Sequence, residues 1–174
     1  MACATISAYT FDVCSNSIGG VKRVWLANYK DDAISATSAD VITAFASGVT
    51  WTQFPFRKNT ASMTSTVNIN DEGGNYISTE LTMLFSRMDT QKRLAMNALM
   101  LAEVMAIVED CNGKRWFLGH DNPLACSAGE GATGTAKGDS NRYSITLTDD
   151  SLEFPQEVSG DISLPDPVTP VSNG

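Results

Sequence analysis

The residues that could carry out chemistry are few and widely spaced. The chain has one histidine, His120, and four cysteines, Cys3, Cys14, Cys111 and Cys126. A Ser–His–Asp or Cys–His enzyme would depend on His120, which we interpret instead as a turn residue after a strand. The cysteines form no CxxC pair, so they do not have the spacing of a zinc site, and we expect reduced thiols rather than disulfides.

Three further motifs resemble functional sites only in part. Residues 68–73 are similar to the start of a calcium-binding loop but lack the glutamate at its twelfth position. Residues 129–134 are rich in glycine, but no helix is expected after them and Glu130 would repel a phosphate. Asp149, Asp150 and Glu153 could act as paired acids, yet the sequence favours a solvated surface. We therefore predict a protein that is not an enzyme and that holds no metal or cofactor.

Composition indicates one folded domain. The chain has 174 residues, of which 43% are hydrophobic and 18% are charged, which is enough apolar material for a buried core. Its N-terminus has neither a basic segment nor an apolar run, so we expect no signal peptide. The most apolar stretch, residues 94–108, is too short to span a bilayer, and no membrane partner is expected.

The net charge of −8 is concentrated near the C-terminus. Six acidic residues and no lysine or arginine follow Arg142, and over the rest of the chain 14 acidic residues face 12 basic ones. A protein that binds nucleic acid tightly needs a basic surface that releases counterions from phosphate. The sequence shows no such surface.

The clearest structural signal is a long hairpin over residues 62–85. Apolar residues alternate with Ser, Thr and Asn over 62–70 and again over 76–85, on either side of the Gly-rich turn 71–75. This period of two predicts two antiparallel strands with one apolar and one polar face. The polar face is almost free of lysine and arginine. Long edge strands with few charges are prone to aggregate, and pairing with a neighbouring subunit would remove that hazard.

Other segments are less regular. We predict strands over 21–27, 50–54 and 142–148, and a hairpin that joins 104–109 to 114–118 through Asn112–Gly113. A helix should begin after the N-cap Asp89, with Leu94, Ala98 and Leu101 forming its core stripe. We interpret 31–45 as a loop with one short element and 126–138 as a loop of small residues.

Several of these stretches together resemble the tail tube proteins of long-tailed bacteriophages. They are the polar hairpin 60–85, the helix–strand junction 92–110, the hairpin 112–119, and the pattern Gly134 to Leu147 with its Gly-Asp, Asn and alternating Thr/Leu, followed by Glu153-Phe154-Pro155. The resemblance covers roughly residues 50–157. It implies a mainly β fold, a β-sandwich or rolled antiparallel sheet with one flanking helix.

The resemblance also implies a structural function. Six subunits would form a ring, the rings would stack into a tube in the virion tail after assembly in the host cytoplasm, and other tail proteins would bind at its ends. DNA would pass through the lumen without sequence-specific binding. Residues 1–157 would form the domain with an N-terminal arm, and 158–174 an acidic, proline-containing tail. The arm, the loop 126–138 and this tail are candidates for contacts with neighbouring subunits.

The polar hairpin face has the character that a DNA conduit needs, because each lysine or arginine on phosphate would add affinity and friction. We therefore predict that this face lines the channel. The candidate residues are Ser62, Thr64, Thr66, Asn68, Asn70, Ser78, Glu80 and Thr82.

Three alternatives stay open. The polar face could be the solvent face of a monomeric sheet. The protein could be a tail terminator or distal tail ring protein with the same fold. It could also be a monomeric β-sandwich that binds carbohydrate by stacking on Trp25, Trp51 and Trp116, although we expect these tryptophans in the core or at an interface.

Overall fold

The computed structural model describes residues 6–10, 14 and 16–166. Two sheets and one helix make up the fold. The elements are β1 (Val21–Asn28), β2 (Ile34–Ser38), β3 (Val41–Phe45), β4 (Thr52–Gln53), β5 (Ala61–Asn68), β6 (Tyr76–Ser86), α1 (Thr90–Leu101), β7 (Val104–Asp110), β8 (Arg115–Leu118), β9 (Ala125–Ala132), β10 (Arg142–Ser151) and β11 (Gln156–Val158). The first sheet has the strand order β2-β3-β11-β8-β7-β1-β4, and the second has the order β5-β6-β10-β9.

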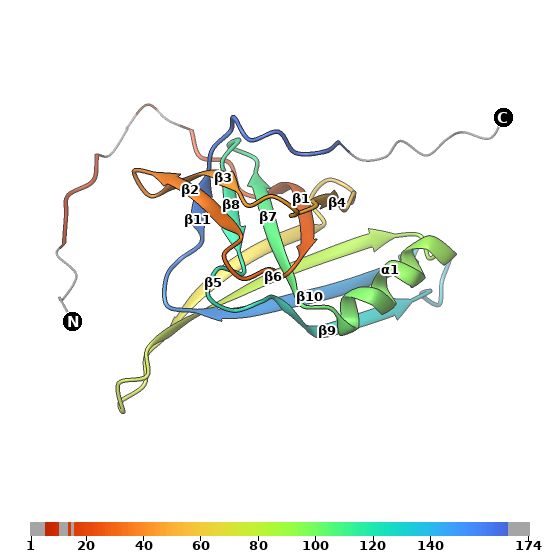
Figure 1. Cartoon of the computed structure of the whole chain (residues 1–174). Coiled ribbons are helices and arrows are strands. Elements are labelled where there is room, and N and C mark those ends of the chain that lie inside the picture. Colours follow the sequence, from red (N-terminus) through yellow and green to blue (C-terminus); the bar gives the residue numbers. More distant parts are fainter. Residues whose placement is uncertain (1–5, 11–13, 15, 167–174) are drawn as a thin grey trace.

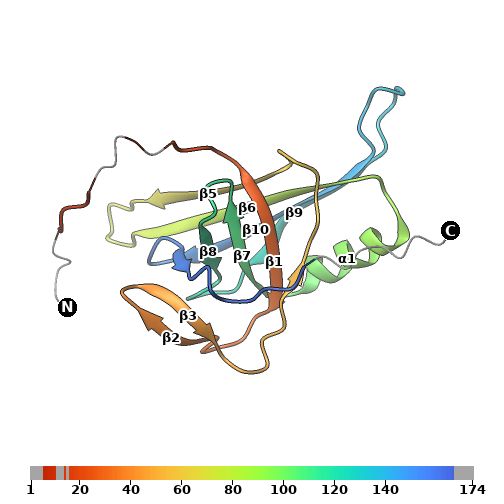
Figure 2. The same cartoon turned by 90° about the horizontal axis from the view of Figure 1, so that it is seen from above.

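The two sheets pack face to face, and their strands cross steeply (Figures 1 and 2). The main core lies between them, where Val24, Val108, Leu81 and Leu147 are fully buried. A second apolar cluster lies on the other face of the seven-stranded sheet, around Trp25. All strand pairs are antiparallel except β3 with β11. The expected mainly β sandwich with one helix is confirmed.

Strand β7 shows why the seven-stranded sheet needs a cover on both faces. Residues Val104 to Glu109 are all buried, without the alternation of a half-exposed strand. A continuous apolar run of this kind is typical of a strand that is covered on both sides. Its turn into β8 contains the predicted Asn112–Gly113, and Gly113 adopts the left-handed φ of +84° that this turn requires.

The long hairpin is present with the predicted register. Met63 lies opposite Leu81 and Val67 opposite Ile77 on the apolar face, while Ser62 lies opposite Thr82 on the polar face. Polar and apolar residues alternate in this hairpin because one face of the sheet packs against the core and the other faces solvent, so the register could be predicted from the sequence.

Two segments that we interpreted as loops contain strands. Residues 31–45 contain the whole hairpin β2–β3, whose turn places Ala39 and Asp40 at φ of 51° and 61°. Neither is the glycine or asparagine that usually marks such a turn. The segment 126–138 begins with most of β9, which pairs with β10. Its Gly and Ala residues give no alternation, so the pairing partner and not the local sequence determines this strand.

Helix α1 begins where predicted, but the side that it buries is not the predicted one. Asp89 Oδ1 accepts a hydrogen bond from the Lys92 backbone N–H at 2.8 Å, as an N-cap does. The expected core stripe is wrong: Leu94 is 57% exposed and Leu101 83% exposed, whereas Leu99 is the buried residue. The helix flanks the β9 side of the second sheet (Figure 1), so a different stripe faces the core.

The domain does not end at residue 157. That boundary falls inside β11, which lies between β3 and β8, and Val158 is 2% exposed. Residues 159–166, which we call the strap, then cross the outer face of the seven-stranded sheet, where Ile162 and Leu164 pack on the second cluster. The described part of the predicted tail is therefore part of the fold, and residues 167–174 lie outside the described residues.

Candidate functional surface

The predicted channel residues of the hairpin gather on the outer face of the four-stranded sheet. Ser62, Thr64, Thr66 and Asn68 come from β5, and Ser78, Glu80 and Thr82 come from β6. Their registers are direct: Thr64 lies opposite Glu80, and Thr66 opposite Ser78. Each of these side chains is exposed or half-buried. The structure thus brings seven of the eight candidates onto one surface.

Asn70, the eighth candidate, shapes the hairpin turn. Its side-chain oxygen accepts a hydrogen bond from the Glu72 backbone N–H at 3.1 Å, and its backbone N–H donates to Asn75 Oδ1 at 3.1 Å. The Gly73 N–H donates a hydrogen bond to the Asn70 backbone carbonyl oxygen at 2.9 Å. Such local bonds are the usual reason for asparagine in a turn. We therefore assign Asn70 to the turn at the end of this surface.

Two further strands extend the same polar surface, and the sequence interpretation missed their contribution. On β10, Ser144, Thr146 and Thr148 alternate with the inward-facing Ile145 and Leu147. Thr146 Oγ1 lies 3.1 Å from Thr82 Oγ1, and Thr148 Oγ1 lies 2.7 Å from Ser127 Oγ of β9. The alternation in 142–148 already contained the signal. The neighbouring strand β9 carries no such signal, because its Gly and Ala residues do not alternate between polar and apolar.

The surface is polar but carries few cations. Its carboxylates are Glu80, Glu130 and Asp150, and its one guanidinium is that of Arg142 at the end of β10. The remaining polar side chains are hydroxyls and amides, which can both donate and accept hydrogen bonds with water. Such a surface is well hydrated and offers phosphate little to bind.

Both long edges of this sheet lack a strand partner in the described part of the chain. β5 and β9 are its first and last strands, each of 8 residues. β5 contains no charged residue, proline or glycine, and β9 contains one charged residue, Glu130. Edge strands with so few charged residues are templates for pairing with another strand.

One ionisable group lies between the sheets. Asp149 is 5% exposed, and its Oδ2 accepts a hydrogen bond from the Gly119 N–H at 2.9 Å, which links β10 to the end of β8. Burial raises the pKa of Asp149 to about 6, and the charges of Asp150 and Asp121 also raise it. Its Oδ1 has no hydrogen-bond partner among the described residues. The prediction that this carboxylate is solvated is wrong.

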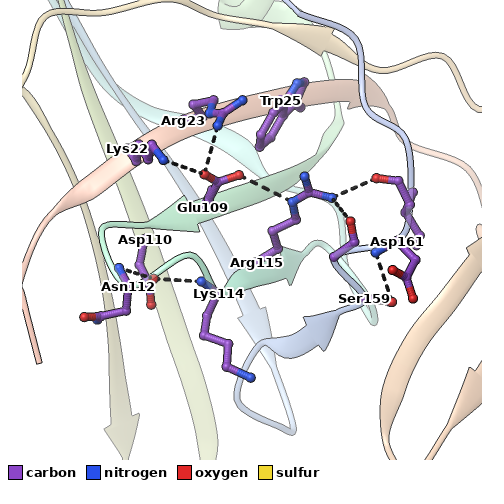
Figure 3. Close-up of polar contacts among 12 residues, drawn as sticks. Lys22, Arg23, Trp25, Glu109, Asp110, Asn112, Lys114, Arg115, Ser159 and Asp161 are labelled. Atoms are coloured by element: carbon purple, nitrogen blue, oxygen red, sulfur yellow. Dashed lines mark hydrogen bonds and ion pairs between the residues drawn. The ribbon is translucent and has the colours of Figure 1, made fainter. Parts of the chain in front are cut away.

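A cluster of charges holds the strap against the other sheet (Figure 3). The Glu109 carboxylate, 6% exposed, lies 3.4 Å from Arg23 and from Arg115 and 3.6 Å from Lys22. Arg115 also donates to the Ile162 carbonyl at 2.8 Å. Buried carboxylates persist in folds when cations compensate them. The charge cluster therefore has a structural role: through Arg115 it fixes the strap on the seven-stranded sheet.

The remaining candidates occupy structural positions. His120 lies in the turn after β8, as predicted, with Nδ1 2.9 Å from Asp121 Oδ1. Trp25 is buried under the strap and donates from Nε1 to the Pro165 carbonyl at 2.8 Å. Trp51 packs against Phe45, with ring centroids 5.1 Å apart. Trp116 is half-buried against the main core. All three indoles are packed, as we expected of them.

The described residues offer neither a metal site nor a membrane-spanning helix. Over residues 6–10, 14 and 16–166, no group of three or more His, Cys, Asp or Glu side chains is placed to hold a metal ion. No helix of that part of the chain is long and apolar enough to cross a membrane. In comparisons with known proteins, the chain matches no family model and no curated protein.

Proposed function

We propose that this protein is the subunit of a bacteriophage tail tube, in which six copies form a ring and the rings stack around a channel for DNA. The observation that carries the proposal is a four-stranded sheet with two unpaired edges and a polar outer face with almost no cations. The edge strands β5 and β9 run in opposite directions, because each pair from β5 through β6 and β10 to β9 is antiparallel. In copies related by rotation about one axis, β9 of each copy would therefore pair with β5 of the next as antiparallel strands, and the ring would close.

The size of the resulting channel supports this geometry. Six four-stranded sheets would make a barrel of about 24 strands. With roughly 4.8 Å between strands and a tilt of about 40°, its backbone would be about 48 Å across. That leaves room for duplex DNA inside the side chains. Closure would also remove both exposed edges in every copy.

The polar surface suits a conduit better than a binding site. Every lysine or arginine that contacts phosphate adds affinity that falls with salt concentration, and here three carboxylates accompany one guanidinium. DNA would slide past a hydrated surface of hydroxyl groups. The carbohydrate-binding alternative loses its main support, because the three tryptophans that would stack on sugars are packed within the fold.

Light scattering after size-exclusion chromatography, followed by negative-stain microscopy of concentrated protein, tests the proposal. We expect rings and hollow rods of constant diameter. Closed rings that never stack would instead indicate a tail terminator or distal tail ring protein. A single monomer peak at every concentration would contradict the proposal and favour a solvated sheet.

A further inference from the structure

Helix α1 presents large apolar side chains to solvent. Leu94, Met100 and Leu101 are 57%, 60% and 83% exposed, whereas Leu99 is 5% exposed and packs on the main core. A helix of a monomeric protein usually turns its charged side outward. Exposed apolar surface is typical of interaction sites, and of these three residues Met100 lines a groove.

A groove of about 280 Å³ runs between this helix and the last strand of the four-stranded sheet. Met96 and Met100 form its helical wall, Tyr143 and Cys126 close it, and Gly129 and Gly131 form its floor. The two glycines lie opposite Ile145 and Tyr143 on the inner face of β9. Gly129 leaves room beneath the helix beside the unpaired edge of β9, whereas at Gly131 the Tyr143 ring and the end of the Met88 side chain already fill the place of a side chain.

We propose that α1 is a clasp that covers the seam between two copies of this chain and receives the apolar face of the neighbour's β5. The proposal rests on the proposed ring and names the contact that would hold it closed. A strand that joins the edge of β9 continues the sheet, so its apolar side falls on the same side as Gly129 and Gly131, under Met100.

Strand β5 supplies a suitable face. Met63 and Val67 point to the inner side of the sheet; Met63 packs against the main core of its own chain, whereas Val67 remains 49% exposed. In a ring every copy of β5 runs in the same direction and every copy of β9 runs in the opposite direction, so the new pair is antiparallel. The incoming Val67 then enters the groove, and unbranched Met96 and Met100 can adapt to it.

The first test replaces one clasp residue with a charge. We expect Met100→Glu to keep the fold, because the side chain is exposed in the monomer, and to raise the concentration needed for assembly at least about tenfold, because the carboxylate would be buried at the seam. Leu152→Glu is the matched control: Leu152 is 76% exposed but follows β10, away from the groove. This control should assemble like the wild type.

The outcomes separate the two proposals. If the wild type forms no ring or rod, the proposed function fails. If the wild type assembles and Met100→Glu assembles equally well, the clasp is wrong and the tube stands. A second test mixes a Met100→Cys chain with a Met63→Cys or Val67→Cys chain, each with its native cysteines changed to serine. Disulfide-linked dimers should form from the mixture under oxidation, and their absence from assembled wild-type-like rods would overturn the clasp.

Discussion

Asp149 makes the stability of the fold depend on pH. Its carboxyl lies between the sheets, and its pKa is raised from 3.8 to about 6, mainly by burial. The folded state therefore binds the proton more tightly than the unfolded state does. This contribution to stability is fully present below about pH 4 and is lost as the pH rises through about 6, and it amounts to at most about 3 kcal/mol.

We therefore expect Asp149→Asn to be more stable than the wild type at pH 7.5 and to lose this advantage at pH 4. The asparagine keeps the acceptor for the Gly119 N–H but has no charge to bury. Thermal unfolding at a fixed protein concentration from pH 4 to 8 measures the difference. Asp71→Asn, which removes an exposed charge from the distant hairpin turn, is the control and should keep the wild-type pH profile. An unchanged slope in Asp149→Asn would show that another group titrates.

At the scale of elements, a strand could be predicted from the sequence where one of its faces is exposed to solvent and the other is buried. The hairpin β5–β6 was predictable because one face is exposed to solvent and the other is buried. Polar and apolar residues therefore alternate along both strands, and this alternation specifies the pairing register. Strand β9 was not, because glycine and alanine carry no such alternation and β10 supplies its pairing. The outward side of α1 was also not predictable, because an apolar stripe at helical spacing has the same appearance whether it faces its own core or another molecule.

The same scale explains the strap. Nothing in the prolines and acids after residue 157 indicates that Ile162 and Leu164 are half-buried, because the Trp25 side of the seven-stranded sheet, on which they pack, comes from distant strands. Arg115 and Trp25 then fix the backbone of the strap by hydrogen bonds to the carbonyls of Ile162 and Pro165. Local sequence describes the strap as a tail, and only the tertiary structure makes it part of the core.

The strap yields a stability prediction. We expect Ile162→Ala and Leu164→Ala each to lower the free energy of unfolding by roughly 1–2 kcal/mol, because each removes a half-buried side chain from the second cluster. Ser163→Ala lies between them, is exposed, and should change stability by less than about 0.5 kcal/mol. Urea unfolding monitored by tryptophan fluorescence provides the measurement. If all three changes lower the free energy of unfolding by less than about 0.5 kcal/mol, the side chains of the strap do not stabilise the fold.

For the whole molecule, the proposed tube requires one face of the sandwich to turn inward, and the open question is which face does so. The four-stranded sheet and the seven-stranded sheet both have exposed polar strands: Thr64 and Thr66 lie on β5, and Ser35 and Thr37 lie on β2. The sequence pointed to the first pair through the length of its hairpin and its lack of charge. The structure adds that the hairpin face continues across β10 and β9, whereas β2 is the short edge of the other sheet.

Lysine pairs at these two places distinguish the inner from the outer wall. We expect both Thr64→Lys/Thr66→Lys and Ser35→Lys/Thr37→Lys chains to form rods that retain a short DNA duplex, with retention that falls as salt rises. Because the first pair would face the lumen, the DNA held by its rods should resist nuclease, and the DNA on rods of the second pair should be digested. Protection by the Ser35 and Thr37 variant, with digestion on the Thr64 and Thr66 variant, would mean that the opposite wall encloses the channel. Such a result would reject the assignment of the hydroxyl-rich sheet to the lumen while leaving the rod itself intact.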